Sequence, residues 1–309
     1  MSSSGGLSPI DLRVMHHWST ATYNTFLYGE AQQNVMHVTV PQLAFENEFL
    51  LNGMLGIASL HMQYLLPNPE DYQKQTNIYR VKALNSFRQA LARLDTKSRS
   101  YDAALVMSIL LLVLCCKDNN PEEDELGIVN WLLLYRGLSS VITLSSFDAV
   151  RISEVAPIFR RQLTELKSTP EVPTVLLKML EEITPLDIDY EGLEYYCHTL
   201  DTIGVLYASL RQDGLGPALY IRIITWGSFC TKEFADFARQ RRPRVLVILA
   251  HYVVFIKLVK GSWYLEGFAD QQIRSIARIL GPEWLPFLEV PLQAVQMTSE
   301  EEIASLMLR

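Results

Sequence analysis

The chain has 309 residues, of which 49% are hydrophobic, 20% charged and 10% aromatic. These proportions are ample for a buried core and exclude a disordered or collagen-like chain. The 34 acidic residues exceed the 27 Lys and Arg, and the net charge of -7 argues against broad, sequence-independent adhesion to nucleic acid.

The N-terminal part of the chain predicts a short tail followed by helices. Residues 1–10 are rich in Ser and Gly, without the charged and apolar regions of a signal peptide, and are expected to be a flexible tail. Residues 49–65 are apolar nearly all round, and Pro67 and Pro69 should end this helix because proline cannot continue the hydrogen-bond ladder. Between residues 76 and 94, apolar side chains recur three or four residues apart. This spacing predicts one buried stripe along a helix, formed by Ile78, Val81, Leu84, Phe87, Leu91 and Leu94.

Two segments are apolar enough to be considered as membrane spans, residues 103–116 and 245–259. A span needs about twenty apolar residues, whereas the first segment has about fourteen and the second contains His251. Both are therefore expected to be buried core helices.

The rest of the chain also reads as helical. The acidic loop at residues 118–125 is expected to be solvated, its carboxylates favouring the N-terminus of the next helix. Further helices are predicted over residues 131–143, 158–167 (more weakly), 190–210, 218–238 and 270–280. Alternating β-branched stretches are too short for a substantial sheet, and no internal repeat is visible. The expected fold class is all-α, a single large helical domain of about ten or more helices over residues 11–309.

The sequence lacks the motifs of common enzyme classes: the G-x-S-x-G elbow, the P-loop, the dinucleotide fingerprint and H-E-x-x-H. The four cysteines form no C-x-x-C pair, so we expect reduced thiols in an intracellular protein and no metal site. Asp187 and Asp189 come nearest to the aspartate-rich diphosphate motif of isoprenoid cyclases without matching it. The basic string at residues 239–244 is expected to bond to a helix end, with a phosphate or carboxylate site as the alternative.

Histidines and aromatic residues are the remaining candidates for a site. His61 and His251 lie in apolar helices and are expected to be hydrogen-bonded core residues, with a ligand-facing or catalytic role as the alternative. His16 and His17, beside Trp18, can line a cavity, but a packed helix start is favoured. A C-terminal aromatic group is expected to pack in the core, with the wall of a cavity as the alternative: Trp263, Tyr264, Phe268, Trp284 and Phe287.

Several blocks of the sequence carry a resemblance to a known family. The blocks near the front are DLRVMHHWSTATYNTF (11–26) and VPQLAFENEFLLNGMLGIASLHM (40–62). Later blocks are WLLLYRGLSSVI (131–142), RRPRVLVILAHYVVFI (241–256) and WYLEGF (263–268). In this order they resemble the regulatory domain of fungal zinc-cluster transcription factors, and the sterol uptake control regulators are the subgroup that we find most similar. The resemblance extends from residue 11 to about residue 291.

This resemblance implies an all-α regulatory domain with a hydrophobic cavity, which in the sterol-responsive subgroup holds a sterol. The candidate ligand-binding residues carried over from the matching blocks are His61, His251, Phe255, Trp263 and Phe268. Such regulators also have a cluster of six cysteines that binds two zinc ions and reads DNA. No such cluster precedes residue 11, so we expect no DNA-binding module and no direct contact with nucleic acid. Phe268 and Val290 stand where the family usually has tryptophan, which reduces the aromatic surface near the expected cavity.

Two functions remain open from the sequence. The favoured one is a regulatory domain of a fungal transcription regulator that binds a sterol or terpenoid-like small molecule and needs no cofactor. It would pair with itself or with a full-length zinc-cluster regulator, have no membrane span, and occupy nucleus and cytoplasm. The alternative is a cytoplasmic enzyme of secondary metabolism recruited from this scaffold, a metal-independent cyclase or pericyclase acting on a terpenoid or polyketide. Its candidate catalytic residues are His61, His251 and Tyr252.

Overall fold

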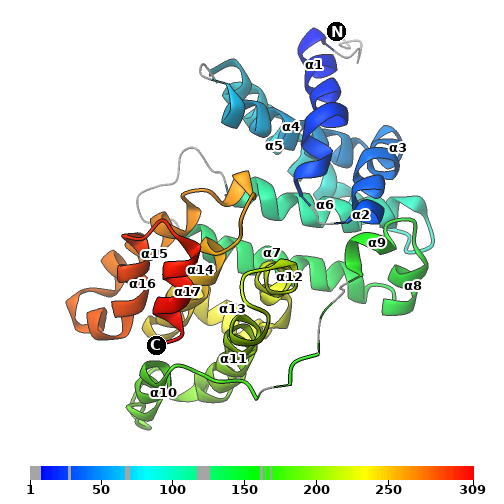
Figure 1. Cartoon of the computed structure of the whole chain (residues 1–309). Helices are drawn as coiled ribbons and strands as arrows, with labels where there is room; N and C mark the ends of the chain where they lie inside the picture. The colour runs from blue at the N-terminus through cyan, green and yellow to red at the C-terminus, as the bar shows by residue number, and fades with distance from the viewer. Residues whose placement is uncertain are drawn as a thin grey trace. The chain divides into compact units, whose positions relative to one another are not determined.

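A computed structural model of the chain describes residues 8–26, 29–66, 70–116, 126–160, 163, 165–167 and 169–309. In these residues the regular structure is entirely helical and no strand is present, which confirms the predicted all-α class (Figure 1). None of the described helices is both long and apolar enough to cross a membrane. The predicted acidic loop at residues 118–125 and the first seven residues of the expected tail lie outside the described residues.

The chain divides into two compact units whose segments alternate along the sequence. Unit 1 consists of Met1–Lys117, Gly137–Arg160 and Ser262–Tyr264. Unit 2 consists of Asp118–Arg136, Arg161–Gly261 and Leu265–Arg309. The expected large domain over residues 11–309 is thus subdivided, and one of the boundaries falls inside helix α7 (Gly127–Thr143).

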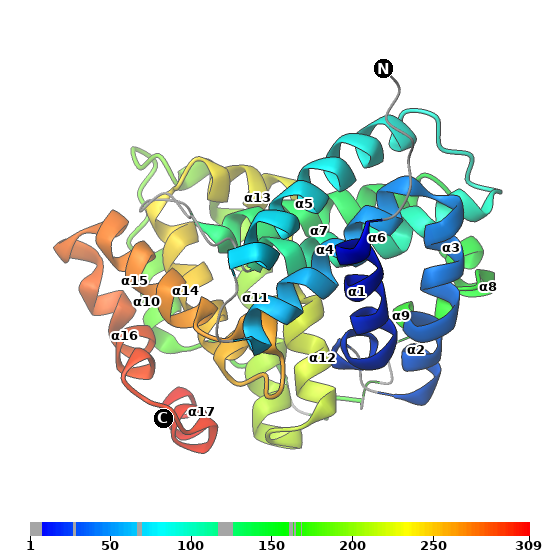
Figure 2. The same ribbon diagram turned by 90° about the horizontal axis from the view of Figure 1, so that it is seen from above.

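Unit 1 is built around α4 (Glu48–Leu65), which is buried along most of its length. It packs mainly against α5 (Glu70–Leu91), which lies beside it in Figure 2, and also against α6 (Arg99–Cys116). Helix α1 (Pro9–His17) begins inside the expected tail, because Ser8 and Asp11 form a capping box at its first turn. The other α-helices with residues only in this unit are α2 (Glu30–Asn34), α3 (Val40–Glu46), α8 (Phe147–Ile152) and α9 (Ala156–Phe159).

The buried face of α5 differs from the predicted apolar stripe. Its most buried residues are Thr76, Tyr79, Ala83 and Phe87. Phe87 belongs to the predicted stripe, but Ile78 and Val81 are 38% and 58% exposed, and the helix ends before Leu94. The prediction is wrong because hydrogen bonds allow polar groups into the interface: the Thr76 hydroxyl donates to Ser59 Oγ at 2.9 Å. The spacing of apolar residues along the sequence does not reveal such buried, hydrogen-bonded polar pairs.

Unit 2 is built around α14 (Pro243–Lys257), buried from Arg244 to Ile256. The other α-helices with residues only in this unit are α10 (Thr174–Glu181), α11 (Leu193–Asp213), α12 (Pro217–Thr225), α13 (Lys232–Arg239), α15 (Phe268–Leu280), α16 (Glu289–Val295) and α17 (Glu300–Met307). The burial of α6 and α14 confirms that the two most apolar segments are core helices.

The weak helix predicted over residues 158–167 is wrong. Helix α9 ends at Phe159, and residues 163 and 165–167 have no helical structure. Residues 163, 165 and 167 are exposed, so the described part of this segment buries little apolar surface. A short helix without tertiary packing is marginal in water.

Candidate functional site

The six candidate site residues fall into two groups, one in each unit. His61 and Trp263 lie together in unit 1. Unit 2 holds the four others, which are His251, Tyr252, Phe255 and Phe268. Among the aromatic residues near the C-terminus, Trp263 packs on Phe26 within unit 1 and Phe268 packs on Trp131 within unit 2.

In unit 1, His61 from α4 stacks on the indole ring of Trp263, with ring centroids 4.8 Å apart and planes tilted by 25°. Its Nδ1 lies 3.2 Å from Nε2 of His17 and 3.1 Å from Oγ1 of Thr22. Burial and the nearby His17 lower the pKa of His61 to about 4. A general acid or base works best with a pKa near the operating pH, so His61 is poorly matched to proton transfer near neutrality.

The indole nitrogen of Trp263 also has a hydrogen-bond partner. The Trp263 Nε1–H donates to Oγ1 of Thr25 at 3.0 Å. The ring of Phe26 packs on Trp263 edge to face, and that of Tyr64 lies 5.9 Å from it, centroid to centroid. The unit 1 cluster, which we define as His17, His61, Trp263 and Thr25, is thus a closed hydrogen-bonded packing arrangement.

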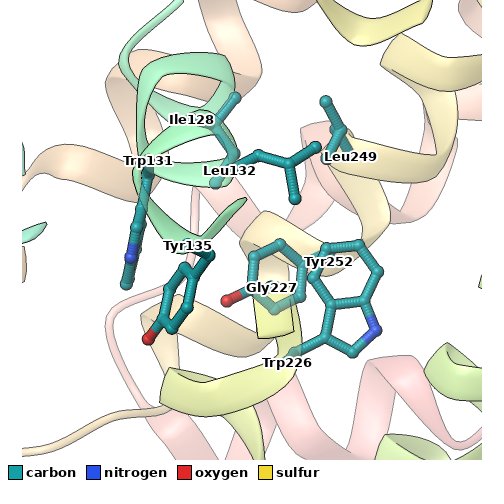
Figure 3. Close-up of a pocket in the computed structure, with 8 residues that line it drawn as sticks. All are labelled: Ile128, Trp131, Leu132, Tyr135, Trp226, Gly227, Leu249 and Tyr252. Atoms are coloured by element: carbon teal, nitrogen blue, oxygen red, sulfur yellow. The ribbon is translucent and has the colours of Figure 1, made fainter. Parts of the chain in front are cut away.

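In unit 2, Tyr252 from α14 lines a small cavity between aromatic rings (Figure 3). Its ring stacks on Trp226 with centroids 4.0 Å apart. The Tyr252 hydroxyl donates to the carbonyl oxygen of Ile223 at 2.8 Å, and the Tyr135 hydroxyl donates to that of Ile224. These two bonds reach consecutive carbonyl groups in the last turn of α12, and the Ile223 carbonyl also accepts the backbone N–H of Trp226. The residues that line this aromatic cavity are Ile128, Trp131, Leu132, Tyr135, Trp226, Gly227, Leu249 and Tyr252.

The aromatic cavity has two properties that bear on binding. Its free volume is about 10 Å³, at the lower limit of space for one water molecule and far below that of ordinary ligand pockets. One wall is Trp131, which is 3% exposed and whose Nε1–H has no acceptor in the described part of the chain. Leaving a buried donor unpaired costs free energy, so an acceptor brought to this N–H would be bound favourably.

The other candidates of unit 2 surround this cavity or lie apart from it. Phe268 packs edge to face on Trp131, with centroids 5.7 Å apart. Phe255 makes a similar contact with Tyr207. The His251 Nε2–H donates to the carbonyl oxygen of Phe287 at 2.9 Å, and burial lowers the pKa of His251 to about 4.

The sequence did not single out Trp131, Tyr135 or Trp226 as site residues. Trp131 and Tyr135 are spaced four residues apart, which places them on one face of a helix, and this was the available signal. Trp226 carries no comparable signal, because only the tertiary structure places it at the cavity.

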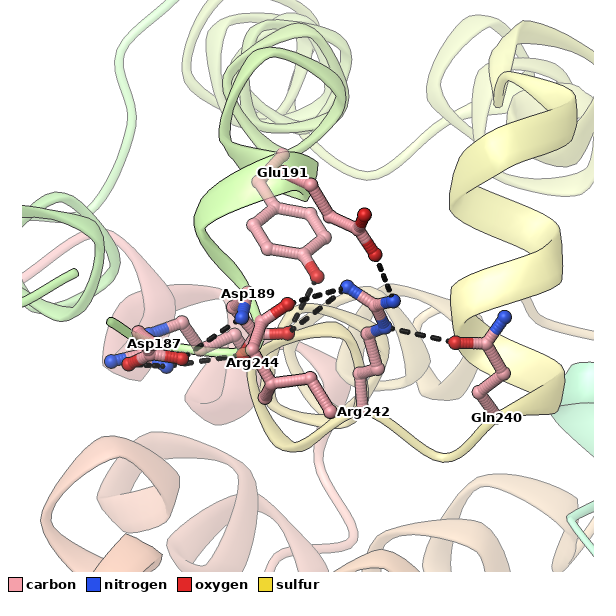
Figure 4. A network of polar contacts seen from close by, with 8 residues as sticks. Asp187, Asp189, Glu191, Gln240, Arg242 and Arg244 are labelled. Atoms are coloured by element: carbon pink, nitrogen blue, oxygen red, sulfur yellow. Dashed lines mark hydrogen bonds and ion pairs between the residues drawn. The ribbon is translucent and has the colours of Figure 1, made fainter. Parts of the chain in front are cut away.

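The basic string and the two aspartates bind each other in a buried network (Figure 4). Arg244 Nη1 lies 2.9 Å from an Asp187 carboxylate oxygen and 3.0 Å from one of Asp189. Arg242 pairs with Glu191 and donates to a carbonyl of the 187–191 segment at 2.8 Å. The arginines thus bond to a neighbouring segment, and their charges are neutralised there. Within the residues that the structure describes, no group of three His, Cys, Asp or Glu is placed to hold a metal ion.

The described residues form an all-helical fold, and comparison with known proteins shows what the chain is similar to. Residues 13–159 match the fungal specific transcription factor domain, and this match confirms the resemblance read from the sequence.

Three relatives extend the match over most of the chain. A Zn(2)-C6 fungal-type transcription factor of Gibberella zeae is 20% identical over 310 residues, covering 92% of this chain and 61% of that protein. Sterol uptake control protein 2 of Saccharomyces cerevisiae is 22% identical, over 86% of this chain and 30% of that protein. The protein of the same name in Candida albicans is 24% identical, over 85% and 39%. The chain spans less than two thirds of the length of each. These relatives support a role in transcription regulation.

Proposed function

We propose that the chain is the regulatory domain of a fungal transcription regulator and that it responds to an apolar small molecule bound at the aromatic cavity. The observation that carries this proposal is the buried N–H of Trp131, which has no acceptor among the described residues and lies beside stacked aromatic rings. Two of the relatives are named for the control of sterol uptake, which supports a ligand of sterol-like character.

The site favours a ligand with a flat apolar body and one hydrogen-bond acceptor. Aromatic rings such as Tyr252 and Trp226 offer apolar faces, and the Trp131 N–H offers a single donor. A sterol has this character, since it joins a fused ring system to one hydroxyl group.

Binding requires the cavity to open, because the present free volume admits no more than about one water molecule. Displacement of the Tyr135 side chain would couple the opening of the cavity to a change in the neighbouring helix α12. Moving it breaks the bond to the Ile224 carbonyl and releases the end of α12. A ligand that binds only the open state shifts the population towards it, and the free energy of opening is subtracted from the affinity. In this proposal the released end of α12 is the signal.

The test is a titration of the full chain with the fluorescent sterol dehydroergosterol, followed by the polarisation of the sterol's own emission. Trp131→Phe keeps an aromatic ring and removes the donor, so we expect the dissociation constant to rise about tenfold, as for one lost hydrogen bond. A competing sterane without a hydroxyl group should bind both proteins equally. Absence of saturable binding to the unaltered chain, or equal sterol affinity of the variant, contradicts the proposal.

A further inference from the structure

Two histidines of unit 1 face each other where α1 packs on α4. His17 is the last residue of α1, and His61 lies in the C-terminal half of α4. Nε2 of His17 is 3.2 Å from Nδ1 of His61, and the two ring centroids are 5.0 Å apart. The hydroxyl oxygen of the fully buried Thr22 lies 3.1 Å from the same Nδ1. Two atoms that carry lone pairs thus approach a third, the Nδ1 of His61.

Hydrogen bonding does not account for both contacts of this nitrogen. A neutral imidazole nitrogen has either one proton or one lone pair, so Nδ1 of His61 can form only one full hydrogen bond. Either His17 or Thr22 supplies that bond, and the other atom stands beside Nδ1 without it. A metal ion would resolve this crowding, because it accepts lone pairs from several atoms at once.

The separation of the two imidazole rings also fits a shared ion. A straight N–H···N bond, which is the preferred geometry, would hold the ring centroids about 5.5 Å apart at this nitrogen spacing. Two imidazoles that bind one Zn²⁺ at about 2.0–2.1 Å and at the tetrahedral angle have nitrogens about 3.3 Å apart and centroids about 5.2 Å apart. The observed 3.2 Å and 5.0 Å are closer to the second arrangement. The two rings are therefore bent towards a common point.

The surroundings suit a divalent transition-metal ion. Imidazole nitrogen is a good ligand for Zn²⁺, Ni²⁺ and Cu²⁺. A ligand nitrogen must be unprotonated, and burial lowers the pKa of both His17 and His61, so both rings are neutral at pH 7. His17 is only partly buried, so an ion can reach the pair from solvent.

We propose that His17 and His61 bind one Zn²⁺ or a similar ion through Nε2 and Nδ1, with water completing the coordination. The ion replaces the hydrogen bond between the rings: the proton of His17 moves to its own Nδ1, and each ring keeps one proton. Two protein ligands make an open, exchangeable site, which agrees with the absence of a three-residue metal group in the described residues. The bound ion would tie the end of α1 to α4. The sequence gave no sign of it, because the expectation of no metal site rested on cysteine spacing.

The experiment is isothermal titration calorimetry of the full chain with ZnCl₂ at pH 7.5, after removal of metals with a chelator. We expect saturable binding of one ion per chain. Loss of an outer-sphere partner typically lowers metal affinity by about 10–100-fold, so His17→Gln, which removes a direct ligand, should raise Kd by at least about tenfold. His16→Gln is the matched control, because His16 is the adjacent histidine of α1 and is exposed, and it should leave Kd unchanged.

A second measurement locates the ion. Trp263 stacks on the His61 ring, so Cu²⁺ bound there should quench the emission of this indole at short range. Saturable quenching should disappear in Trp263→Phe and persist in Trp131→Phe, whose indole lies in unit 2. Circular dichroism checks that each variant keeps its helicity.

Four results would overturn the proposal. They are the absence of saturable Zn²⁺ binding to the unaltered chain, an unchanged Kd in His17→Gln, an equal loss of affinity in His16→Gln, and Cu²⁺ quenching that persists in Trp263→Phe. The site lies in unit 1, so none of these results bears on the aromatic cavity of unit 2.

Discussion

The unit 1 cluster and the aromatic cavity of unit 2 are made of similar residues but differ in how their polar atoms are satisfied. In unit 1, the Trp263 indole donates to Thr25, and His61 lies within hydrogen-bonding distance of His17. In unit 2, the tyrosine hydroxyls are bonded to backbone carbonyls, yet the Trp131 indole has no acceptor in the described residues. The comparison teaches that aromatic content alone does not identify a binding site. A buried donor without a partner is the more specific signal.

The largest expected effect comes from breaking the closed cluster. Trp263→Ala removes a buried indole from unit 1, leaves a cavity, and removes the hydrogen bond that the Thr25 hydroxyl accepts. We expect a loss of about 3–5 kcal/mol in the free energy of unfolding, measured by urea denaturation. Sterol binding in unit 2 should be unaffected. A variant that loses sterol affinity while remaining folded would contradict the assignment of the site to unit 2.

The next prediction concerns pH and compares the buried histidines of the two units. Burial lowers the pKa of His61 and of His251 to about 4, below the ordinary value of 6.5. As the pH is lowered, these histidines are therefore protonated in the unfolded chain before they are protonated in the folded one. Their contribution to the free energy of unfolding is fully present above pH 6.5 and is lost as the pH decreases towards 4. Each histidine contributes roughly 3 kcal/mol to this loss.

His61→Gln and His251→Gln test this contribution separately. Unfolding free energies of the unaltered chain and of each variant, measured at pH 7 and at pH 4.5, should show a smaller acid loss in the variants. Parallel pH profiles for a variant and the unaltered chain would show that the substituted histidine is not protonated preferentially in the unfolded state.

A moderate effect is expected from filling space at the aromatic cavity. A Cβ atom at Gly227 would lie 2.6 Å from the Tyr135 ring, so Gly227→Ala forces that ring to move. We expect a loss of about 1–3 kcal/mol in thermal or urea unfolding, as for other overpacked sites. Gly137→Ala in α7 is the matched control: a Cβ atom there would meet no atom within 4 Å outside its own stretch of helix, and the substitution should stabilise the helix by about 0.5–1 kcal/mol. Equal stabilities of the two variants would show that Tyr135 is not tightly packed.

The smallest expected effect is a difference in stability between two matched tryptophan variants, one in each unit. Trp263→Phe and Trp131→Phe remove similar volumes, but only the first also breaks a hydrogen bond. The stability loss of Trp263→Phe should therefore exceed that of Trp131→Phe by about 1 kcal/mol. Equal losses in urea denaturation would indicate that Trp131 has an acceptor after all.

Much of the fold could be predicted because the strongest helices are apolar all round. The burial of α6 and α14 could be predicted from their own apolar residues, without knowing which helices surround them. The α5 face could not be predicted, since Thr76 and Tyr79 are buried through hydrogen bonds to other helices. The candidate site was harder to predict from the sequence than the fold. Tyr252 was a candidate, but Trp226 joins it only through tertiary packing, and the pairing of Arg244 with Asp189 links residues that the sequence suggested for unrelated roles.

The alternation of the two units along the chain has a consequence for synthesis. The hydrogen bond from Trp263 to Thr25 joins residues separated by 238 positions, and the segment Ser262–Tyr264 completes unit 1. A chain emerging from the ribosome would therefore hold an unfinished unit 1 until residue 264 has been made, by which time most of unit 2 has already emerged. Apolar surface around His61 and Phe26 would stay uncovered during that interval and would be open to chaperones or to aggregation. Truncations that end before residue 264 should misfold in their N-terminal part, far from the cut.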